Sequence, residues 1–206
     1  MTEELDLSPR TVFRVGFFFE LGLVLIAAIL GEVLHDEPFP FRIDWSARDL
    51  LWALLAALPP AAGALFLTSP PGRRLLPFRK IYERVKEVLG KPIQGLGLDE
   101  IILLSGAAGI GEEVLFRGVL QPALGLWLTS LVFGLLHALT PAYFILAAVM
   151  GAYLGWLQMA SGNLLVPITV HWAYDVIALL ILKRRFESDA AAASSPGVNG
   201  VTKEAP

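Results

Sequence analysis

The stretch Ser105–Leu120, SGAAGIGEEVLFRGVL, places two glutamates and an arginine inside a run of otherwise apolar and small residues. A charge at the centre of a bilayer-spanning helix costs about 2.5–3.5 kcal/mol on insertion scales, so three of them in one helix need a reason. Glu113 and Arg117 stand four residues apart, on one helical face, where they can pair. Glu112 points about 100° away from Glu113 by the helical period. The stretch therefore predicts one carboxylate in an ion pair and one that is free for chemistry.

The small residues that precede these charges predict close helix packing. Side chains of this size let the backbone of a second membrane helix approach closely. Such an approach would bring polar groups from separate helices together. The residues concerned are Ser105, Gly106, Ala107, Ala108, Gly109 and Gly111.

The composition of the whole chain is that of a membrane protein. Of its 206 residues, 55% are hydrophobic and 17% are charged, and the mean hydropathy is +0.64. The net charge of -3 gives no basic surplus that would indicate nucleic acid as a partner. Cysteine is absent, which excludes disulfides, a cysteine nucleophile and thiolate metal ligands. Any metal would therefore need histidine and carboxylate ligands.

Six apolar segments predict an all-α fold, a polytopic bundle of about six transmembrane helices. They lie at residues 15–34, 50–67, 98–120, 124–139, 142–160 and 164–182. Most are long enough to cross about 30 Å of hydrocarbon, and the fourth is short, as a helix packed mainly against protein can be. We expect residues 1–186 to form one transmembrane domain, with the polar motifs in residues 98–177. Residues 187–206, rich in Ala, Ser, Gly and Pro, are expected to be a disordered tail.

The lysines and arginines predict the orientation, because cytoplasmic loops collect them. If the N-terminus is inside and all six segments cross the membrane, the loops and termini place only Arg42 and Arg48 outside, so both termini are expected in the cytoplasm. Between the second and third segments, the sequence LLPFRKIYERVKEVLG (75–90) has apolar residues at helical spacing and a basic polar face. It predicts a cytoplasmic interfacial helix on the anionic leaflet, or alternatively a solvated helical linker.

Two of the three histidines, His137 and His171, lie in apolar segments. Alone, each can be a packing residue. His171 and Asp175 are four residues apart, so the carboxylate can orient the imidazole or both can face one cavity. Phe133 lies one turn before His137 and can wall the site, or can simply contact core or lipid.

Two further titratable residues are not expected to take part in the chemistry. Glu20 lies in the first apolar segment and has no partner at helical spacing, so it is expected near the interface or behind the site. His35 lies in the polar sequence HDEPFP and is expected at the surface.

Three of these motifs together resemble the CAAX protease and bacteriocin-processing family of intramembrane proteases, also called the CPBP or Abi family. GEEVLFRG (111–118), FGLLH (133–137) and HWAYD (171–175) match the family patterns Glu-Glu-x-x-x-Arg, Phe-x-x-x-His and His-x-x-x-Asn/Asp, in that order on successive helices. The resemblance runs from near Leu98 to Ile177. One motif alone would be weak, and it is their order and membrane context that make the match specific.

The resemblance implies an endopeptidase that hydrolyses peptide bonds with glutamate-activated water. Glu112 is then the general base, and His137 positions the same water. His171 and Asp175 stabilise the oxyanion, and the remaining motif residues, Glu113, Arg117 and Phe133, support the site. Many family members carry Asn where this chain has Asp175. An ionised Asp cannot donate a hydrogen bond, so Asp175 is either protonated or acts through His171.

The cofactor stays open at this point, because the family has been described both as metalloproteases and as metal-free glutamate proteases. Glu112, His137 and His171 could bind a divalent metal such as zinc and leave a position for water. Alternatively, Glu112 and His137 activate water directly. No HExxH spacing decides between the two, and we favour the metal-free mechanism slightly.

Two functions of other classes use the same residues. The polar cluster can form a relay in a membrane proton or ion carrier, or the chain can be a catalytically idle immunity or partner protein that retains the fold. For a protease, the expected partners are a peptide or membrane-protein substrate and the lipid bilayer. Eukaryotic relatives remove the tripeptide after a prenylated cysteine, and prokaryotic relatives are linked to bacteriocin maturation and self-immunity. The small size favours a prokaryotic member in the cell membrane, and the sequence does not predict the oligomeric state.

Overall fold

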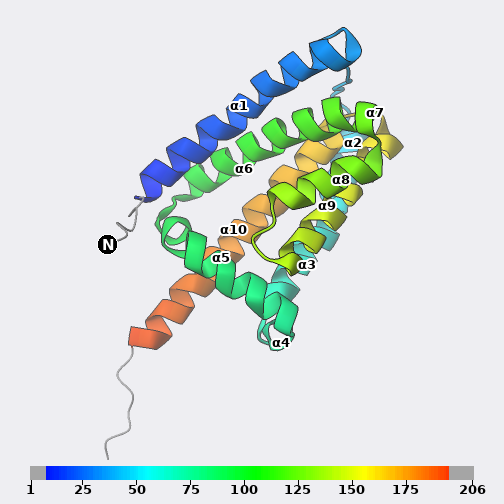
Figure 1. Cartoon of the computed structure of the whole chain (residues 1–206). Coiled ribbons are helices and arrows are strands. Elements are labelled where there is room, and N and C mark those ends of the chain that lie inside the picture. The colour runs from blue at the N-terminus through cyan, green and yellow to red at the C-terminus, as the bar shows by residue number, and fades with distance from the viewer. Residues whose placement is uncertain (1–7, 195–206) are drawn as a thin grey trace, which may run out of the picture.

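The chain folds into a bundle of helices. The computed structural model describes residues 8–194, and every regular element in that range is helical, which confirms the predicted all-α class. The long helices run side by side along one direction, and α5 lies across one end of them (Figure 1). In chain order the elements are α1 (Pro9–His35), α2 (Ala47–Ala56), α3 (Leu58–Thr68), α4 (Pro70–Arg74), α5 (Leu76–Gly95), α6 (Leu98–Glu113), the π-helical η1 (Val114–Leu120), α7 (Gln121–Leu124), α8 (Leu126–Leu136), α9 (Pro141–Ser161) and α10 (Leu165–Ser194).

Within residues 8–194, four helical stretches are long and apolar enough to cross a membrane: α1, the α2–α3 pair, α9 and α10. They correspond to four of the six predicted segments. The predicted segment 98–120 is divided between α6 and η1, and the segment 124–139 contains only the 11-residue α8. α8 packs along α9 on one face only, and Leu131, Leu135 and Leu136 on its other face are more than half exposed. The expectation that this short helix packs mainly against protein is therefore wrong. The protein is therefore a multi-pass membrane protein, although length and composition mark only four of the six predicted spans.

α6 packs between α1 and α10, and its small residues make this possible (Figure 1). A β-carbon added at Gly109 would lie 3.1 Å from the carbonyl oxygen of Ile168 and 3.2 Å from the nitrogen of Trp172, both in α10. One added at Gly111 would collide with the backbone carbonyl of Glu20 in α1. The predicted close approach at the small residues is confirmed, and it occurs on two sides of the helix.

We predict that Gly111→Ala destabilises the protein. The alanine methyl group would collide with the backbone of α1, which cannot move aside as a flexible side chain can. Overpacking of this kind typically costs about 1–3 kcal/mol. The measurement is the thermal unfolding midpoint of the purified protein in detergent. The matched control is Gly22→Ala in α1, where nothing lies within 4 Å of the added carbon. Equal midpoints for the two variants would contradict the prediction.

α10 extends well beyond the apolar segment that the sequence marked. It ends at Ser194, so residues 187–194 are helical, and the expectation of a disordered tail from residue 187 is wrong for them. Four consecutive alanines, at 190–193, favour helix strongly. Asp189 also accepts hydrogen bonds from Tyr82 and Lys86 of α5, which hold this end of the helix. The remainder of the predicted tail, residues 195–206, lies outside the described residues.

Candidate active site

The helix that carries Glu112 and Glu113 changes its winding directly after them. α6 ends at Glu113, and η1 continues as a π-helical turn. At its end, the N–H group of Gln121 donates to the carbonyl of Phe116, five residues back. π-helical turns are rare and occur frequently at functional sites. The winding therefore marks the region around the two glutamates independently of their charge.

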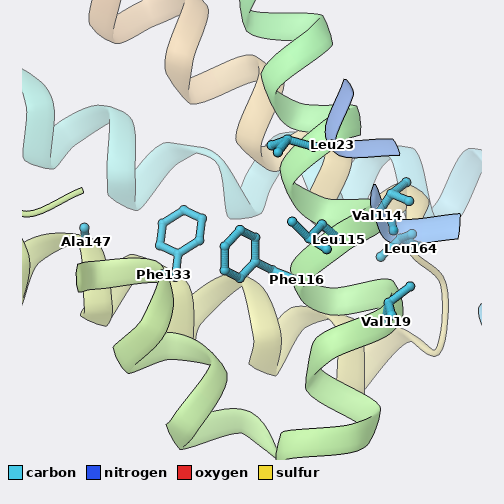
Figure 2. Close-up of a cluster of buried hydrophobic side chains, with 9 residues drawn as sticks. Leu23, Val114, Leu115, Phe116, Val119, Phe133, Ala147 and Leu164 are labelled. Atoms are coloured by element: carbon cyan, nitrogen blue, oxygen red, sulfur yellow. The ribbon is translucent and has the colours of Figure 1, made fainter. Parts of the chain in front are cut away.

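Apolar packing surrounds this turn. Phe116 of η1 meets Phe133 of α8 edge to face, with ring centroids 5.0 Å apart. The two rings lie next to each other in the cluster shown in Figure 2. On the other side, the His35 Nε2 atom donates to the carbonyl oxygen of Val119 at 2.9 Å, which ties the end of α1 to η1. His35, expected at the surface, thus fixes the π turn. The buried members of the cluster are Leu23, Ala27, Val114, Leu115, Phe116, Val119, Phe133, Ala147 and Leu164.

Glu113 and Arg117 form the predicted ion pair, and it is completely buried. The Arg117 Nη1 atom lies 2.8 Å from Glu113 Oε1, and the two side chains are 1% and 0% exposed. Arg117 Nη2 also donates to the carbonyl oxygen of Gly151 in α9 at 3.0 Å. The guanidinium stacks over the Phe133 ring, 4.5 Å from its centre. Arg117 therefore joins the glutamate motif to α9 and α8.

The His171 ring lies among three carboxylates. Its Nδ1 atom is 2.7 Å from Glu113 Oε1, and its Nε2 atom is 3.4 Å from Asp175 Oδ2 and 3.9 Å from Glu112 Oε2. Carboxylate oxygens lie near both ring nitrogens. The ring can donate a hydrogen bond on each side only when both nitrogens carry a proton. Tyr174 stacks on the ring, with centroids 5.3 Å apart. His171 is thus a fixed donor whose Nε2 side faces Glu112 and Asp175.

Glu112 lies opposite His137. The Glu112 Oε1 atom is 3.5 Å from His137 Nε2, and Glu112 Oε2 is buried without a hydrogen-bond partner among the described residues. His137 Nδ1 donates to the Phe133 carbonyl at 2.8 Å, and the two rings stack at 4.4 Å. In the neutral ring, this bond leaves Nε2 as an acceptor. The Glu112 carboxylate and His137 Nε2 are then both hydrogen-bond acceptors. A water molecule between them can donate to both.

Glu20 lies close to this cluster, although it has no partner at helical spacing along the chain. Its backbone packs against Gly111, the residue before Glu112. Its carboxylate interacts electrostatically with Glu112, His171, Asp175 and His137, and its Oε2 atom is buried with no hydrogen-bond partner in the described range. α1 therefore adds one more carboxylate beside the predicted site.

The members of the cluster differ in exposure. The His137 and Asp175 side chains are 31% and 27% exposed, whereas Glu112 is 11% exposed and the Glu113–Arg117 pair is sealed. His137 and Asp175 are therefore the most accessible polar groups beside Glu112. The ion pair lies behind and acts on the site through His171.

All seven residues predicted for the site from the sequence come together here. Phe133 does wall the site, since its ring contacts both His137 and Arg117. Sequence reasoning missed Tyr174, His35 and the backbone carbonyl of Gly151. The small-xxx-small pair Gly151 and Gly155 in α9 was an available signal for close approach. Gly155 likewise accepts a hydrogen bond from Gln121, at 3.1 Å.

The donor types fit zinc, but their arrangement does not form a ligand set. Carboxylate and imidazole atoms are usual zinc ligands, and both histidines have Nδ1 bonded to an oxygen, as metal-binding histidines commonly do. However, within residues 8–194 no group of three or more His, Asp or Glu side chains is spaced so that it could hold a metal ion. We therefore derive no step through a metal.

The fold and these side chains define a multi-pass membrane protein with a buried carboxylate–imidazole site of the kind used in hydrolysis. Residues 96–177, which contain all three motifs, match the family model described as type II CAAX prenyl endopeptidase Rce1-like. This match confirms the resemblance drawn from the motifs, and the segment is similar to type II CAAX prenyl endopeptidases.

Comparison with individual proteins gives one relative of unknown activity. The chain is 39% identical over 93 residues to the uncharacterised protein YpbD of Bacillus subtilis (strain 168). The alignment covers 44% of this chain and 48% of YpbD, so the chain spans about half the length of that relative. No solved structure matches the chain.

Proposed function

We propose that the protein is an intramembrane endopeptidase that hydrolyses a peptide bond of a peptide or membrane-protein substrate with water activated by Glu112. The observation that carries the proposal is the position of Glu112. Its carboxylate faces His137, has one unpartnered oxygen and lies outside the Glu113–Arg117 pair. A carboxylate in this setting is free to accept a proton.

In the first step, Glu112 and His137 hold one water molecule. Glu112 accepts a proton from the water while the water oxygen forms a bond to the scissile carbonyl carbon. The carbonyl π electrons move to oxygen and give a tetrahedral oxyanion. The Nε2–H group of His171 donates to this oxyanion, while Glu113 keeps the ring in place through Nδ1. Preorganised donors of this kind stabilise the developing charge.

In the second step, the oxyanion collapses and the C–N bond breaks. Glu112 returns its proton to the leaving nitrogen, so the products are a carboxyl group and an amine, and the enzyme is restored. Asp175, 3.4 Å from His171 Nε2, acts by orienting that ring. The low exposure of Glu112 limits exchange of this proton with bulk water before it reaches the amine.

We predict that Asp175→Asn retains cleavage within about tenfold of the wild-type rate, because Asn has the same size and can donate directly to the oxyanion. Asp175→Ala removes the contact with His171 and supplies no donor in its place, and is expected to lose about 10²–10³-fold in kcat. The comparison is made on steady-state rates in liposomes. An inactive Asn variant beside an active Ala variant would overturn this role for Asp175.

The basic residues support a placement with both termini in the cytoplasm, since only Arg42 and Arg48 fall on the other side of the predicted spans. The apolar composition supports a membrane location, and the similarity to YpbD of Bacillus subtilis supports a prokaryotic one. For the substrate, the match to a CAAX prenyl endopeptidase model favours a chain that ends in a prenylated Cys-a-a-X sequence.

The test uses the full chain reconstituted in liposomes with a farnesylated Cys-a-a-X peptide and the same peptide without the prenyl group. Mass spectrometry is expected to detect the released tripeptide with wild-type protein and the prenylated peptide. Failure to cleave either peptide, combined with proton flux that depends on Glu112, contradicts the proposal in favour of a carrier. In a separate arm, a chelator is expected to leave the rate unchanged. A loss that added zinc reverses would retain hydrolysis but contradict the metal-free mechanism.

A further inference from the structure

A basic cavity lies at the end of the bundle crossed by α5, away from the active-site residues. It has a volume of about 470 Å³ and lies between α4, α5 and the last turns of α10. Four cationic and two acidic side chains line it, which leaves a surplus of two positive charges. The cations are Arg73, Arg74, Arg79 and Lys86, and the acids are Glu83 and Asp189.

One network of hydrogen bonds and ion pairs organises this cavity. Asp189 of α10 accepts from the Tyr82 hydroxyl at 2.9 Å and from Lys86 at 2.7 Å, and lies 3.6 Å from Arg73. The Arg73 guanidinium stacks over the Tyr82 ring at 4.7 Å. Burial and the hydrogen bond to Asp189 raise the pKa of Tyr82 to about 12, so the hydroxyl remains a donor. The network fixes Arg73 and Lys86, while Arg74 has no acidic partner among the residues that the structure describes.

The surroundings of the cavity place it at the level of the lipid headgroups. The membrane-crossing α2–α3 pair ends at Thr68, just before α4. Phe66, Leu75 and Leu76, on either side of α4 in the chain, are about half exposed. The α5 helix turns Ile81 and Val85 inward and leaves Arg79 and Arg84 outside. A surface with apolar side chains next to a cationic cavity suits an amphiphile with a negatively charged headgroup.

We propose that this cavity binds the phosphate headgroup of an anionic phospholipid, with the acyl chains along the exposed apolar residues near α4. The positive surplus favours an anionic over a zwitterionic lipid. Such a lipid joins α4 and α5 to the end of α10. Because α5 leads directly into α6, it also stabilises the connection to the helix that carries Glu112. The proposal concerns a lipid site and does not depend on proteolysis.

The experiment measures the thermal unfolding midpoint of the full chain in detergent during titration with phosphatidylglycerol, phosphatidylcholine or inorganic phosphate. Phosphatidylglycerol is expected to raise the midpoint in a saturable manner, and the other two are expected to have little effect. The variant Arg74→Gln/Arg79→Gln keeps the Asp189 network and is expected to weaken the apparent affinity at least tenfold. Its control, Arg42→Gln/Arg48→Gln, makes the same change in charge elsewhere and is expected to respond like the wild type.

Three results would overturn the proposal. Equal stabilisation by phosphatidylglycerol and phosphatidylcholine would show a nonspecific lipid effect. Full stabilisation by inorganic phosphate would show a free-anion site. An equal loss in both double variants would show that total charge, and not this cavity, determines the response.

Discussion

Glu112→Gln is expected to lower kcat for peptide cleavage by about 10²–10⁴-fold, the usual contribution of a general base. Glutamine keeps the size of the side chain and can still contact His137, but it cannot take a proton from water. Glu112 is not a partner of Arg117, so its loss leaves the buried ion pair intact. The variant is therefore expected to unfold within a few degrees of the wild type, and the measurement is the cleavage rate beside the unfolding midpoint.

Glu113→Gln is the matched comparison, because it makes the same chemical change one residue further along the helix. It removes the charge that faces Arg117 and His171, so it is expected to lower the midpoint as well as the rate. The two variants thus differ in stability and not only in activity. Wild-type cleavage by Glu112→Gln would sink the proposed mechanism, whatever the behaviour of Glu113→Gln.

The sequence predicted which of these residues come together because each motif is local. Glu113 with Arg117 and His171 with Asp175 are four residues apart, and such pairs meet on any helix. Charged side chains are unfavourable in contact with lipid, so the charged residues of the separate motifs are expected to face the same interior of the helix bundle. The assembly of the three motifs follows from these two facts, together with the small residues that allow α1 and α10 to approach α6.

The sequence could not predict how the two glutamates would be connected. Helical spacing separates Glu112 from Glu113 by direction, yet the His171 ring bridges them, with Nδ1 toward Glu113 and Nε2 toward Glu112. This contact depends on the position of α10 relative to α6, which no local pattern specifies. The π turn is similar, since it is maintained by distant partners such as Phe133 and His35.

Two expectations, a surface position for His35 and a disordered tail from residue 187, rested on the composition of the neighbouring residues. His35 lies among polar residues, but its ring reaches the Val119 carbonyl 84 residues later. Residues 187–194 have the composition of a tail, but Asp189 has partners in α5 and the alanines favour helix. In both cases a tertiary contact outweighs what the neighbouring residues indicate.

Arg117→Met is expected to destabilise the protein by about 3–5 kcal/mol, the cost of leaving one charge of a buried pair without its partner. Methionine fills much of the space beside Phe133, so the loss is mainly electrostatic. Glu113 would remain 0% exposed, with His171 as its other close partner. The carbonyl of Gly151 would also lose its donor. The measurement is the unfolding midpoint in detergent, and a change of less than about 1 kcal/mol would contradict the role given to the pair.

The double variant Glu113→Gln/Arg117→Met separates a packing role for the pair from a role in the active site. With both charges removed, no charge is left buried alone, so much of the lost stability is expected to return. His171 then has an amide in place of the carboxylate at Nδ1, so the fixed donor toward the oxyanion is weakened and cleavage stays low. Recovery of stability without recovery of rate would show that the pair positions His171. Recovery of both would show that it only locks the helices together.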